Sequence, residues 1–247
     1  MKLSVISIAY NNLAGLKKTL AVFQKGQFID SIELVIVDGG SNDGTSEFLK
    51  EQSITQNWVS EPDKGIYNAM NKGLNMAKGD YVWFLNSGDF AYNAESVFNL
   101  LTILETNPDA VYSETMMVDE GGKELGTRSK ISTRQLPEML SWKSFRMGMN
   151  VSHQSFVIKR DLALPYDESY RYVSDIDWMI RCLKACKNIR KSERILACFT
   201  LDGFSSKHRK ASNKERFKVL QKHYGFLSNL ISHIQIIIRK ILKPSGL

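Results

Sequence analysis

An unbroken apolar run, followed at once by polar residues, constrains the fold of this chain more than any other stretch. The run covers residues 81–85, and the tetrapeptide Asn-Ser-Gly-Asp follows it and ends at Asp89. A short segment that is apolar on both faces is typical of a central strand with helices above and below it. In α/β sheets, ligand chemistry gathers just past the carboxyl ends of such strands. Asp89 is therefore a candidate site residue, and the alternative is that it caps a helix beginning near Asn93.

The order of strand and helix patterns in the first half of the chain indicates the fold class. Strand patterns occur, with helical patterns and short links between them, at residues 3–9, 32–37, 58–59, 81–85 and 110–112. Such alternation predicts an α/β fold in which a mostly parallel sheet is flanked by helices and the crossovers are right-handed.

The second half of the chain is less regular. Residues 114–150 lack a clear period, and one interpretation is an antiparallel strand pair with a mobile acceptor loop. Strands are then expected at residues 153–158 and 195–201, with a helix at residues 175–186.

Length and cysteine content favour a cytoplasmic protein. The 247 residues suffice for one α/β domain with a full core. The strand pattern begins at Leu3 and leaves no room for a signal peptide, and no apolar segment reaches the roughly 18 residues of a spanning helix. The three cysteines lack a C-x-x-C spacing, which favours buried, reduced thiols.

The basic excess lies at the C-terminal end. From Lys207 onward there are ten Lys or Arg residues and one acid, Glu215, which is a net charge of +9. The net charge of the whole chain is +7. Residues 1–206 carry 23 basic and 25 acidic groups, a net of −2. We therefore divide the chain into a body, 1–206, and a basic helical tail, 207–247. Within the body, the regular strand and helix alternation ends near residue 113, and 114–206 is the less regular half.

The tail has an amphipathic pattern. Its apolar residues share one face at helical spacing: Leu227, Leu230, Ile231, Ile234, Ile237, Ile238 and Ile241. An apolar stripe flanked by cations suits a helix lying in an anionic membrane surface, peripheral on the inner face of the cell membrane. The alternatives are a helix docked on the protein's own core or on a twin subunit in a homo-oligomer. Nucleic acid is not expected as a partner, because no aromatic residues interleave with the cations.

Three polar loops follow three apolar strands and should converge at one edge of the sheet. They begin at Tyr10 and Asn11, at Asp38 and at the Asn-Ser-Gly-Asp turn. Backbone N–H groups of the glycine-rich loop after Asp38 suit phosphate, and carboxylates suit a ribose or a metal. Turn or N-cap duty is the alternative for Asp38 and the preferred role for Asp43. The absence of G-x-G-x-x-G and of a P-loop argues against dinucleotide oxidoreductases and P-loop enzymes.

Four motifs in register give a family resemblance. Residues 4–11, 35–45, 79–89 and 174–178 together resemble glycosyltransferase family two, whose members are inverting enzymes of the Rossmann-like GT-A fold. Two further stretches are similar to the branch that builds bacterial surface polysaccharides: residues 61–73 and 153–155. The resemblance covers roughly residues 2–205. It implies a GT-A catalytic domain at residues 1–206, with 1–113 as the nucleotide-binding half and 114–206 as the acceptor half.

The resemblance implies a role for each matched residue. Asp89 would bind Mg²⁺ or Mn²⁺, and Asp175 would be the general base, with Asp177 beside it. Residues of the nucleotide site would be Tyr10, Asn11, Asp38, Gly39, Ser41, Lys64 and Ser87. An N-cap is the alternative role of Asp175, and a first-turn helix acid is the preferred role of Asp177.

The chain departs from the family pattern at three positions. Asn86 and Gly88 stand where relatives have acids, which leaves Asp89 as the one carboxylate of that turn. A single carboxylate suffices because Mg²⁺ keeps waters and takes phosphate oxygens, so the cation should arrive with the nucleotide. Met70 replaces a frequent arginine, which passes the diphosphate contact to Lys64 or another cation.

Two histidines have open roles. His153 precedes an apolar strand, so a satisfied structural histidine is the preferred interpretation, with an acceptor-site role as the alternative. His208 lies in a basic run and reads as a surface residue, with a metal or diphosphate contact as the alternative.

The resulting hypothesis is an inverting, metal-dependent glycosyltransferase that moves a hexosyl or related sugar. Its donor would be a UDP- or GDP-linked sugar, and its acceptor a lipid-linked glycan. The missing acids motivate a second hypothesis, a nucleotide-sugar-binding module without turnover. A sugar-phosphate nucleotidyltransferase is a third, against which stands the lack of a glycine-rich Lys/Arg loop near the N-terminus.

Overall fold

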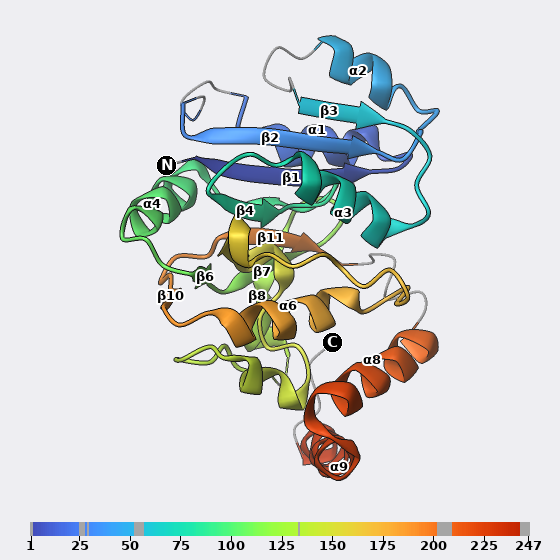
Figure 1. Cartoon of the computed structure of the whole chain (residues 1–247), viewed down its shortest axis with the longest axis vertical. Coiled ribbons are helices and arrows are strands. Elements are labelled where there is room, and N and C mark those ends of the chain that lie inside the picture. The colour runs from blue at the N-terminus through green and yellow to red at the C-terminus, as the bar shows by residue number, and fades with distance from the viewer. Residues whose placement is uncertain are drawn as a thin grey trace.

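The computed structural model describes residues 2–24, 28, 30–51, 57–132, 134–201 and 209–242. Its main sheet has seven strands, and a second sheet has four (Figure 1). In spatial order the main sheet contains β10 (Ile189–Lys191), β6 (Ala110–Tyr112), β9 (Phe156–Lys159), β4 (Tyr81–Phe84), β1 (Leu3–Ala9), β2 (Ile32–Asp38) and β3 (Asn57–Ser60). The second sheet contains β5 (Phe90–Ala91), β11 (Ala197–Thr200), β7 (Thr115–Val118) and β8 (Glu124–Thr127).

The main sheet is mostly parallel, as predicted, because only β9 runs antiparallel to its neighbours β4 and β6. The α-helices are α1 (Leu13–Leu20), α2 (Thr45–Glu51), α3 (Ile66–Met76), α4 (Ala94–Glu105), α5 (Arg128–Ile131), α6 (Ser174–Ala185), α8 (Arg209–Tyr224) and α9 (Phe226–Leu242). Three 3-10 helices are η1 (Trp142–Met147), η2 (His153–Ser155) and η3 (Arg160–Leu162). The fold class inferred from the sequence is confirmed.

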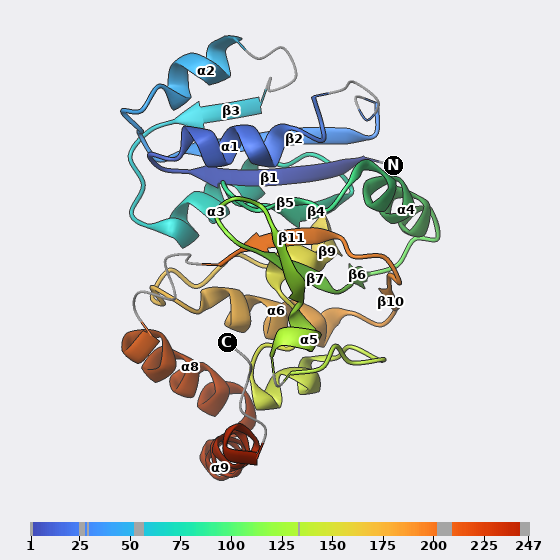
Figure 2. The ribbon, with the colours of Figure 1, turned by 180° about the vertical axis from the view of Figure 1, so that it is seen from behind.

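Strand β4 is the buried centre that its sequence predicts. Its side chains alternate between two hydrophobic cores, with Val82 and Phe84 in one and Tyr81 and Trp83 in the other. Helices α3 and α6 contribute to the first core, and α1 and α4 contribute to the second (Figures 1 and 2). Apolar side chains on both faces are needed because each face of β4 is covered by helices.

Two local expectations meet different outcomes. Asn93, not Asp89, caps α4, because Asn93 Oδ1 accepts a hydrogen bond of 2.8 Å from the backbone N–H of Ser96. The strand expected at residues 153–158 begins only at Phe156, and the three residues before it form η2. This turn removes the side chains of residues 153 and 154 from the strand pattern and makes them available to a site.

Residues 114–150 contain the antiparallel pair that was one interpretation of the sequence. Strands β7 and β8 pair in antiparallel register, and β7 also pairs with β11 in the second sheet. Helices α8 and α9 form the end of the molecule opposite α2 (Figures 1 and 2). No helix within the described ranges is long and apolar enough to cross a membrane.

Candidate active site

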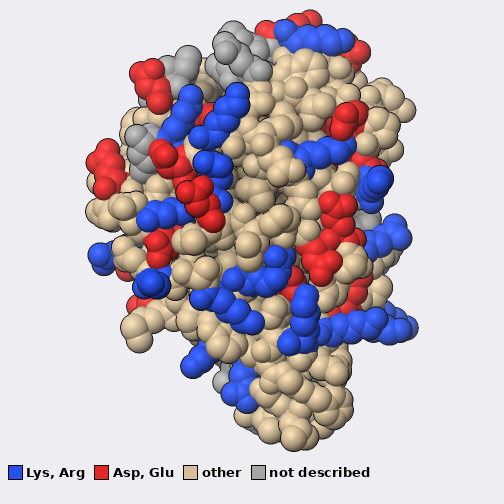
Figure 3. All heavy atoms as spheres, in the orientation of Figure 1, with Lys and Arg blue, Asp and Glu red and all other residues tan. Residues whose placement is uncertain are grey.

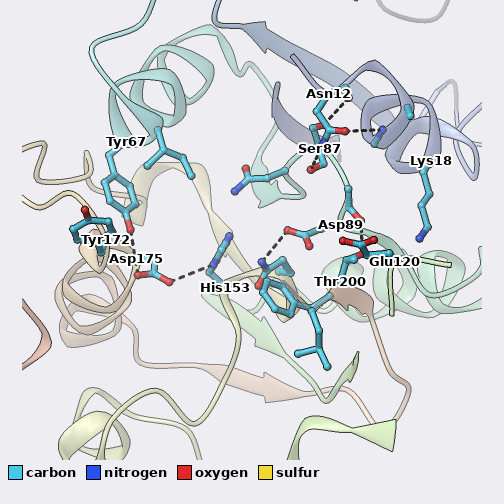
Figure 4. A pocket seen from close by; sticks show the side chains of 18 of the residues that line it. Asn12, Lys18, Tyr67, Ser87, Asp89, Glu120, His153, Tyr172, Asp175 and Thr200 are labelled. Carbon is cyan, nitrogen blue, oxygen red and sulfur yellow. Dashed lines mark hydrogen bonds and ion pairs between the residues drawn. The ribbon is translucent and has the colours of Figure 1, made fainter. Parts of the chain in front are cut away.

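A cavity of about 730 Å³ lies next to the turn that follows β4. Residues from α1, α3, α6, η2 and the end of β11 complete its wall. Figure 4 labels ten of its side chains: Asn12, Lys18, Tyr67, Ser87, Asp89, Glu120, His153, Tyr172, Asp175 and Thr200. The cavity therefore occupies the edge at which α/β sheets place ligands.

Asp89 is a buried carboxyl on the cavity wall, with only 8% of its surface exposed. Gln154 Nε2 donates a hydrogen bond of 2.9 Å to Asp89 Oδ2 (Figure 4). Thr19 Oγ1 donates one of 2.6 Å to the backbone carbonyl of Asp89, which fixes the turn on α1. Burial raises the pKa of Asp89 to about 6, although the hydrogen bond from Gln154 lowers it. A buried carboxylate is poorly solvated by water, so a bound cation stabilises it more than the cation would stabilise an exposed carboxylate.

Asp175 lies at the start of α6 and faces the same cavity. The helix N-cap is Val173, so Asp175 is not the cap. Its Oδ2 is 3.5 Å from His153 Nδ1, and its Oδ1 is 3.5 Å from the hydroxyl of Tyr67 (Figure 4). The backbone N–H of Ile176 donates to Oδ1 at 2.9 Å, which holds the carboxylate in place.

The short helix η2 connects the two acids. Trp83 Nε1 donates a hydrogen bond of 2.7 Å to the backbone carbonyl of Gln154, which ties the turn to the central strand β4. His153 Nε2 is buried and has no hydrogen-bond partner in the structure. The preferred interpretation of His153 as a satisfied histidine is therefore wrong, because one ring nitrogen is orphaned at the cavity that the residue lines.

The loops after β1 and β2 bring together five residues expected at the nucleotide site. Asp38 is fully buried and accepts hydrogen bonds from the hydroxyls of Ser41 and Ser60. The φ of Asn11 is +48°. Its Oδ1 accepts a hydrogen bond from the backbone N–H of Asn42, and its own backbone N–H donates one to Ser41 Oγ.

Tyr10, beside this loop, is 69% exposed. A Cβ on Gly39 would come within 3.2 Å of the Tyr10 ring, so Gly39 permits the close approach. An exposed aromatic ring over a rigid polar loop is a surface on which a base can stack. Asp43 has the turn role preferred from the sequence, accepting from the backbone N–H groups of Leu13 and Thr45.

The cations that line the cavity differ from the lysine expected to contact a diphosphate. Ser87 lines the cavity and donates to the backbone carbonyl of Asn12 at 3.0 Å. Among the described lining residues the cations are Lys18 and Arg171, whereas Lys64 lies outside that lining. Met70 is buried in the first core, so it takes no part in the site.

Asp177 serves the fold and lies away from the cavity lining. It is fully buried in the first turn of α6, the position preferred from the sequence, and its carboxylate contacts two cations and a histidine ring. Arg181 Nε, Lys222 Nζ and His223 Nε2 lie 2.5, 3.1 and 2.8 Å from its carboxylate oxygens. Burial alone would raise the pKa of Asp177, but these hydrogen bonds hold it well below its usual range. The residue thus ties α6 to α8.

The sequence did not indicate some of the site residues. The predicted role of His208 stays a prediction, because His208 lies outside the described residues. Tyr67 and Gln154 stand inside recognised motifs, but only the packing of α3 and η2 shows which acid each contacts. Lys18 gave no signal, because a lysine between apolar positions of a helix reads as a surface residue.

The residues around Asp89 fit a divalent cation that brings its own ligands. Asn86 Oδ1 is a buried oxygen without a hydrogen-bond partner, and Asn86 lines the cavity with Asp89. Amide and carboxylate oxygens are ligands that Mg²⁺ and Mn²⁺ accept. Within the described residues no three His, Cys, Asp or Glu side chains group into a metal site, so phosphate oxygens would have to complete the shell.

Comparison with known proteins gives one family. Residues 4–163 match the model of glycosyl transferase family 2. An uncharacterised glycosyltransferase of Mycobacterium tuberculosis is 28% identical over 241 residues, 93% of this chain and 88% of that protein. A PGL/p-HBAD biosynthesis glycosyltransferase of Mycobacterium bovis is 30% identical over 168 residues, 63% of this chain and 60% of that protein.

Solved structures share the fold at low sequence identity. Residues 1–349 of TarS from S. aureus, in complex with UDP, align with a TM-score of 0.69 and 16% identity, covering 99% of this chain and 73% of that one. A mannosyltransferase from Pyrobaculum calidifontis, in complex with GDP-Man and Mn²⁺, aligns with a TM-score of 0.63 and 12% identity, covering 100% and 76%. These similarities show the fold.

Proposed function

The chain belongs to glycosyl transferase family 2 and is a glycosyltransferase, and we propose that it transfers a sugar from a nucleoside diphosphate with inversion. The observation that carries the proposal is the placement of two acids in different surroundings on one cavity. Asp89 is desolvated and bonded to an amide, whereas Asp175 is bonded to a phenol and faces a histidine. Distinct environments suit distinct roles, one toward a cation and one toward a proton.

Asp175 is the proposed general base. Its carboxylate takes the proton of the acceptor hydroxyl as that oxygen attacks the anomeric carbon, and the nucleoside diphosphate leaves from the opposite face. Tyr67 and the backbone N–H of Ile176 hold Oδ1, which leaves Oδ2, on the His153 side, for the acceptor. A single displacement of this kind needs no covalent sugar–enzyme intermediate and inverts the configuration.

Asp89 and Asn86 are the proposed protein ligands of Mg²⁺ or Mn²⁺. When bound, the cation supplies charge compensation for the leaving diphosphate. Gln154 keeps the Asp89 carboxylate oriented, and Lys18, on the same cavity wall, adds a positive charge. The mannosyltransferase complex with GDP-Man and Mn²⁺ supports this assignment by analogy of fold.

The donor is proposed to be UDP- or GDP-linked. Structures of the same fold hold UDP-GlcNAc, UDP and GDP-Man, which supports a nucleotide sugar but leaves both bases as candidates. Tyr10, Asn11 and Asp38 would contact base and ribose, with Ser41 and Gly39 shaping the loop.

The acceptor is proposed to be a lipid-linked glycan at the inner face of the cell membrane. Helix α9 supports this, because its apolar residues Leu227, Ile231 and Ile234 are 74%, 50% and 49% exposed. Its polar residues Asn229 and Ser232 are instead buried, with Asn229 Nδ2 bonded to the backbone carbonyl of Phe217 on α8. These exposures favour a lipid surface over docking of the apolar stripe on the protein's own core.

The surface charge agrees with membrane contact. On the face that Figure 3 shows, Lys and Arg side chains lie just above the end of the molecule where α9 lies. Exposed lysines of α8 contribute to that region: Lys210, Lys214, Lys218 and Lys222. Cations beside an exposed apolar stripe are what an interfacial helix requires on anionic lipid. A twin subunit is the remaining alternative.

The test uses Asp175→Asn and Asp89→Asn with a panel of UDP- and GDP-sugars. Asp175→Asn should lower donor turnover by about 10²–10⁴-fold while nucleotide binding by calorimetry stays unchanged. Asp89→Asn should remove the Mn²⁺ dependence of nucleotide binding. The matched control is Asp161→Asn, whose side chain is 87% exposed. Full turnover in Asp175→Asn would contradict the assignment of Asp175 as the base. Nucleotide binding by the wild type that does not depend on Mn²⁺ would contradict the assignment of Asp89 as a metal ligand.

A further inference from the structure

Three arginine side chains act on one another across the acceptor half and the tail: Arg128 and Arg134 belong to the acceptor half, and Arg216 to α8. Arg128 donates through Nη1 to Ser152 Oγ at 2.7 Å and through Nη2 to the backbone carbonyl of Met149 at 2.9 Å. Arg134 Nη1 donates to the same carbonyl at 3.1 Å. Because both bonds end on one oxygen, the two guanidinium nitrogens are at most 6.0 Å apart. We call the three residues the arginine cluster.

The carboxylates of Asp175 and Glu114 act on the arginine cluster from beyond ion-pair distance. Within the described ranges, no Asp or Glu oxygen lies within 4.0 Å of any of the three guanidinium groups. Burial, and next the charge of Arg216, lower the pKa of Arg128 to about 10 and that of Arg134 to about 9. All three groups still carry a full charge at pH 7, so they repel one another in a poorly solvated place.

Two further features indicate a site prepared for a ligand. Arg216 Nε is buried and has no hydrogen-bond partner, so one donor of the cluster is unused. Gly148, whose φ is +98°, lets the Arg134 guanidinium lie against the backbone, since a Cβ there would come 2.8 Å from Arg134 Nη2. A buried donor without an acceptor and like charges close together both cost stability, and an anion would relieve both.

The arginine cluster is tied to the turn that faces the proposed base. Arg128 is bonded to Ser152, and the next residue, His153, has its Nδ1 3.5 Å from Asp175. The Asp175 carboxylate raises the pKa values of Arg128 and Arg216 accordingly. The charges that act on the Asp89 carboxyl are those of His153 and Lys18 instead. Lys18, which acts on Asp89, is therefore not a member of the arginine cluster.

We propose that the arginine cluster binds an oxyanion of the acceptor, a phosphate ester or a carboxylate, and so places the acceptor hydroxyl at Asp175. Guanidinium forks match both oxyanions, because parallel N–H donors meet paired oxygens. The location of the hydroxyl rests on the proposed function, whereas the anion site stands on the cluster alone.

The experiment titrates the full chain with methyl phosphate, dimethyl phosphate and acetate by calorimetry, with and without saturating UDP or GDP plus Mn²⁺. Wild type should bind at least one of these anions at one site, equally well when the nucleotide is present. Arg134→Gln should weaken that binding at least tenfold. The matched control is Arg190→Gln, an exposed arginine of β10 that should change nothing. The preferred anion distinguishes a phosphate-bearing acceptor from a uronate.

A second variant perturbs the cluster without removing a charge, and the thermal midpoints of both variants show whether they fold. Gly148→Ala strains the backbone, whose φ is +98°, and displaces the Arg134 guanidinium, so it should weaken anion binding in the same direction. The proposal is overturned if wild type binds none of the three anions, or if both variants bind them as wild type does. Competition between the anion and the nucleotide would indicate that the arginine cluster binds the donor, which would contradict its proposed role as an acceptor site. Anion binding without nucleotide binding would instead refute the proposed donor and keep the anion site.

Discussion

His153 and Gln154 are consecutive residues of one 3-10 turn, yet their side chains contact different carboxylates. His153 Nδ1 lies 3.5 Å from Asp175, and Gln154 Nε2 donates at 2.9 Å to Asp89. The turn is fixed to the central strand through the 2.7 Å bond from Trp83 to the carbonyl of Gln154. A single rigid turn thus sets the positions of the proposed base and the proposed metal ligand relative to the sheet.

Replacing Gln154 with Met tests this coupling. The variant keeps the side-chain volume but removes the donor to Asp89, so the pKa of Asp89 should rise above its value of about 6. More of the carboxyl is then protonated near neutral pH, and the affinity for UDP or GDP with Mn²⁺ should fall several-fold at pH 6.5. Because the proton is lost at higher pH, the difference from wild type should shrink at pH 8. Calorimetry at both pH values measures it.

The matched control for this variant is Gln221→Met, an exposed glutamine of α8. It should bind nucleotide and Mn²⁺ like wild type at both pH values. A deficit in Gln154→Met that is equal at pH 6.5 and pH 8 would contradict the role of the amide on the Asp89 proton. It would indicate a displaced turn instead.

Lys18 should contribute to donor affinity through its charge. Its side chain lines the cavity with Asp89, and its Nζ lies 4.4 Å from the centre of the Phe90 ring, which holds it in place. Lys18→Met should weaken UDP or GDP binding about tenfold, in line with a charge-assisted phosphate contact, and should reduce its salt dependence. Lys17→Met is the control, since Lys17 is exposed on the same helix and contacts Phe48. Equal losses in both variants would point to helix damage.

The sequence predicts the strands of the sheet well because burial on both faces leaves a local signature. Residues 3–9 and 110–112 form strands with the expected bounds, and residues 81–84 form the buried centre. Pairing of the site residues is a different matter, since Gln154 and Asp89 are 65 positions apart. Only the packing of η2 on β4 decides that contact. Likewise, the arginine cluster has no motif, because the carbonyl of Met149 that joins Arg128 and Arg134 is set by loop geometry.

Asp177 should matter for stability and hardly for catalysis. Asp177→Asn leaves Arg181 and Lys222 without their buried counter-charge, so the free energy of unfolding should fall by about 3 kcal/mol at pH 7. The folded-state pKa of Asp177 lies below its usual value of 3.8, so its stabilisation is complete above that value and is lost as pH falls further. The stability gap between wild type and variant should therefore close in acid. Urea unfolding at pH 7 and pH 3 measures it.

Asp161→Asn serves as the control for the Asp177 variant, because that carboxylate is largely exposed and should contribute little at either pH. Asp177→Asn that remains folded should also keep its turnover with donor. A variant that is as stable as wild type but inactive would contradict the assignment and return Asp177 to the acceptor site.

Helix α9 should bind anionic lipid through its exposed apolar stripe. The double variant Ile231→Asp with Ile234→Asp places two charges on side chains that are about half exposed, so the thermal midpoint should stay near that of wild type. Its binding to phosphatidylserine vesicles should fall at least tenfold, because the charges cannot enter the acyl boundary and also repel anionic lipid. Gln235→Asp adds a charge at an exposed polar position of the same helix and should have a small effect. Vesicle binding that the double variant retains, together with a dimer that it loses in sedimentation, would assign the stripe to a twin subunit.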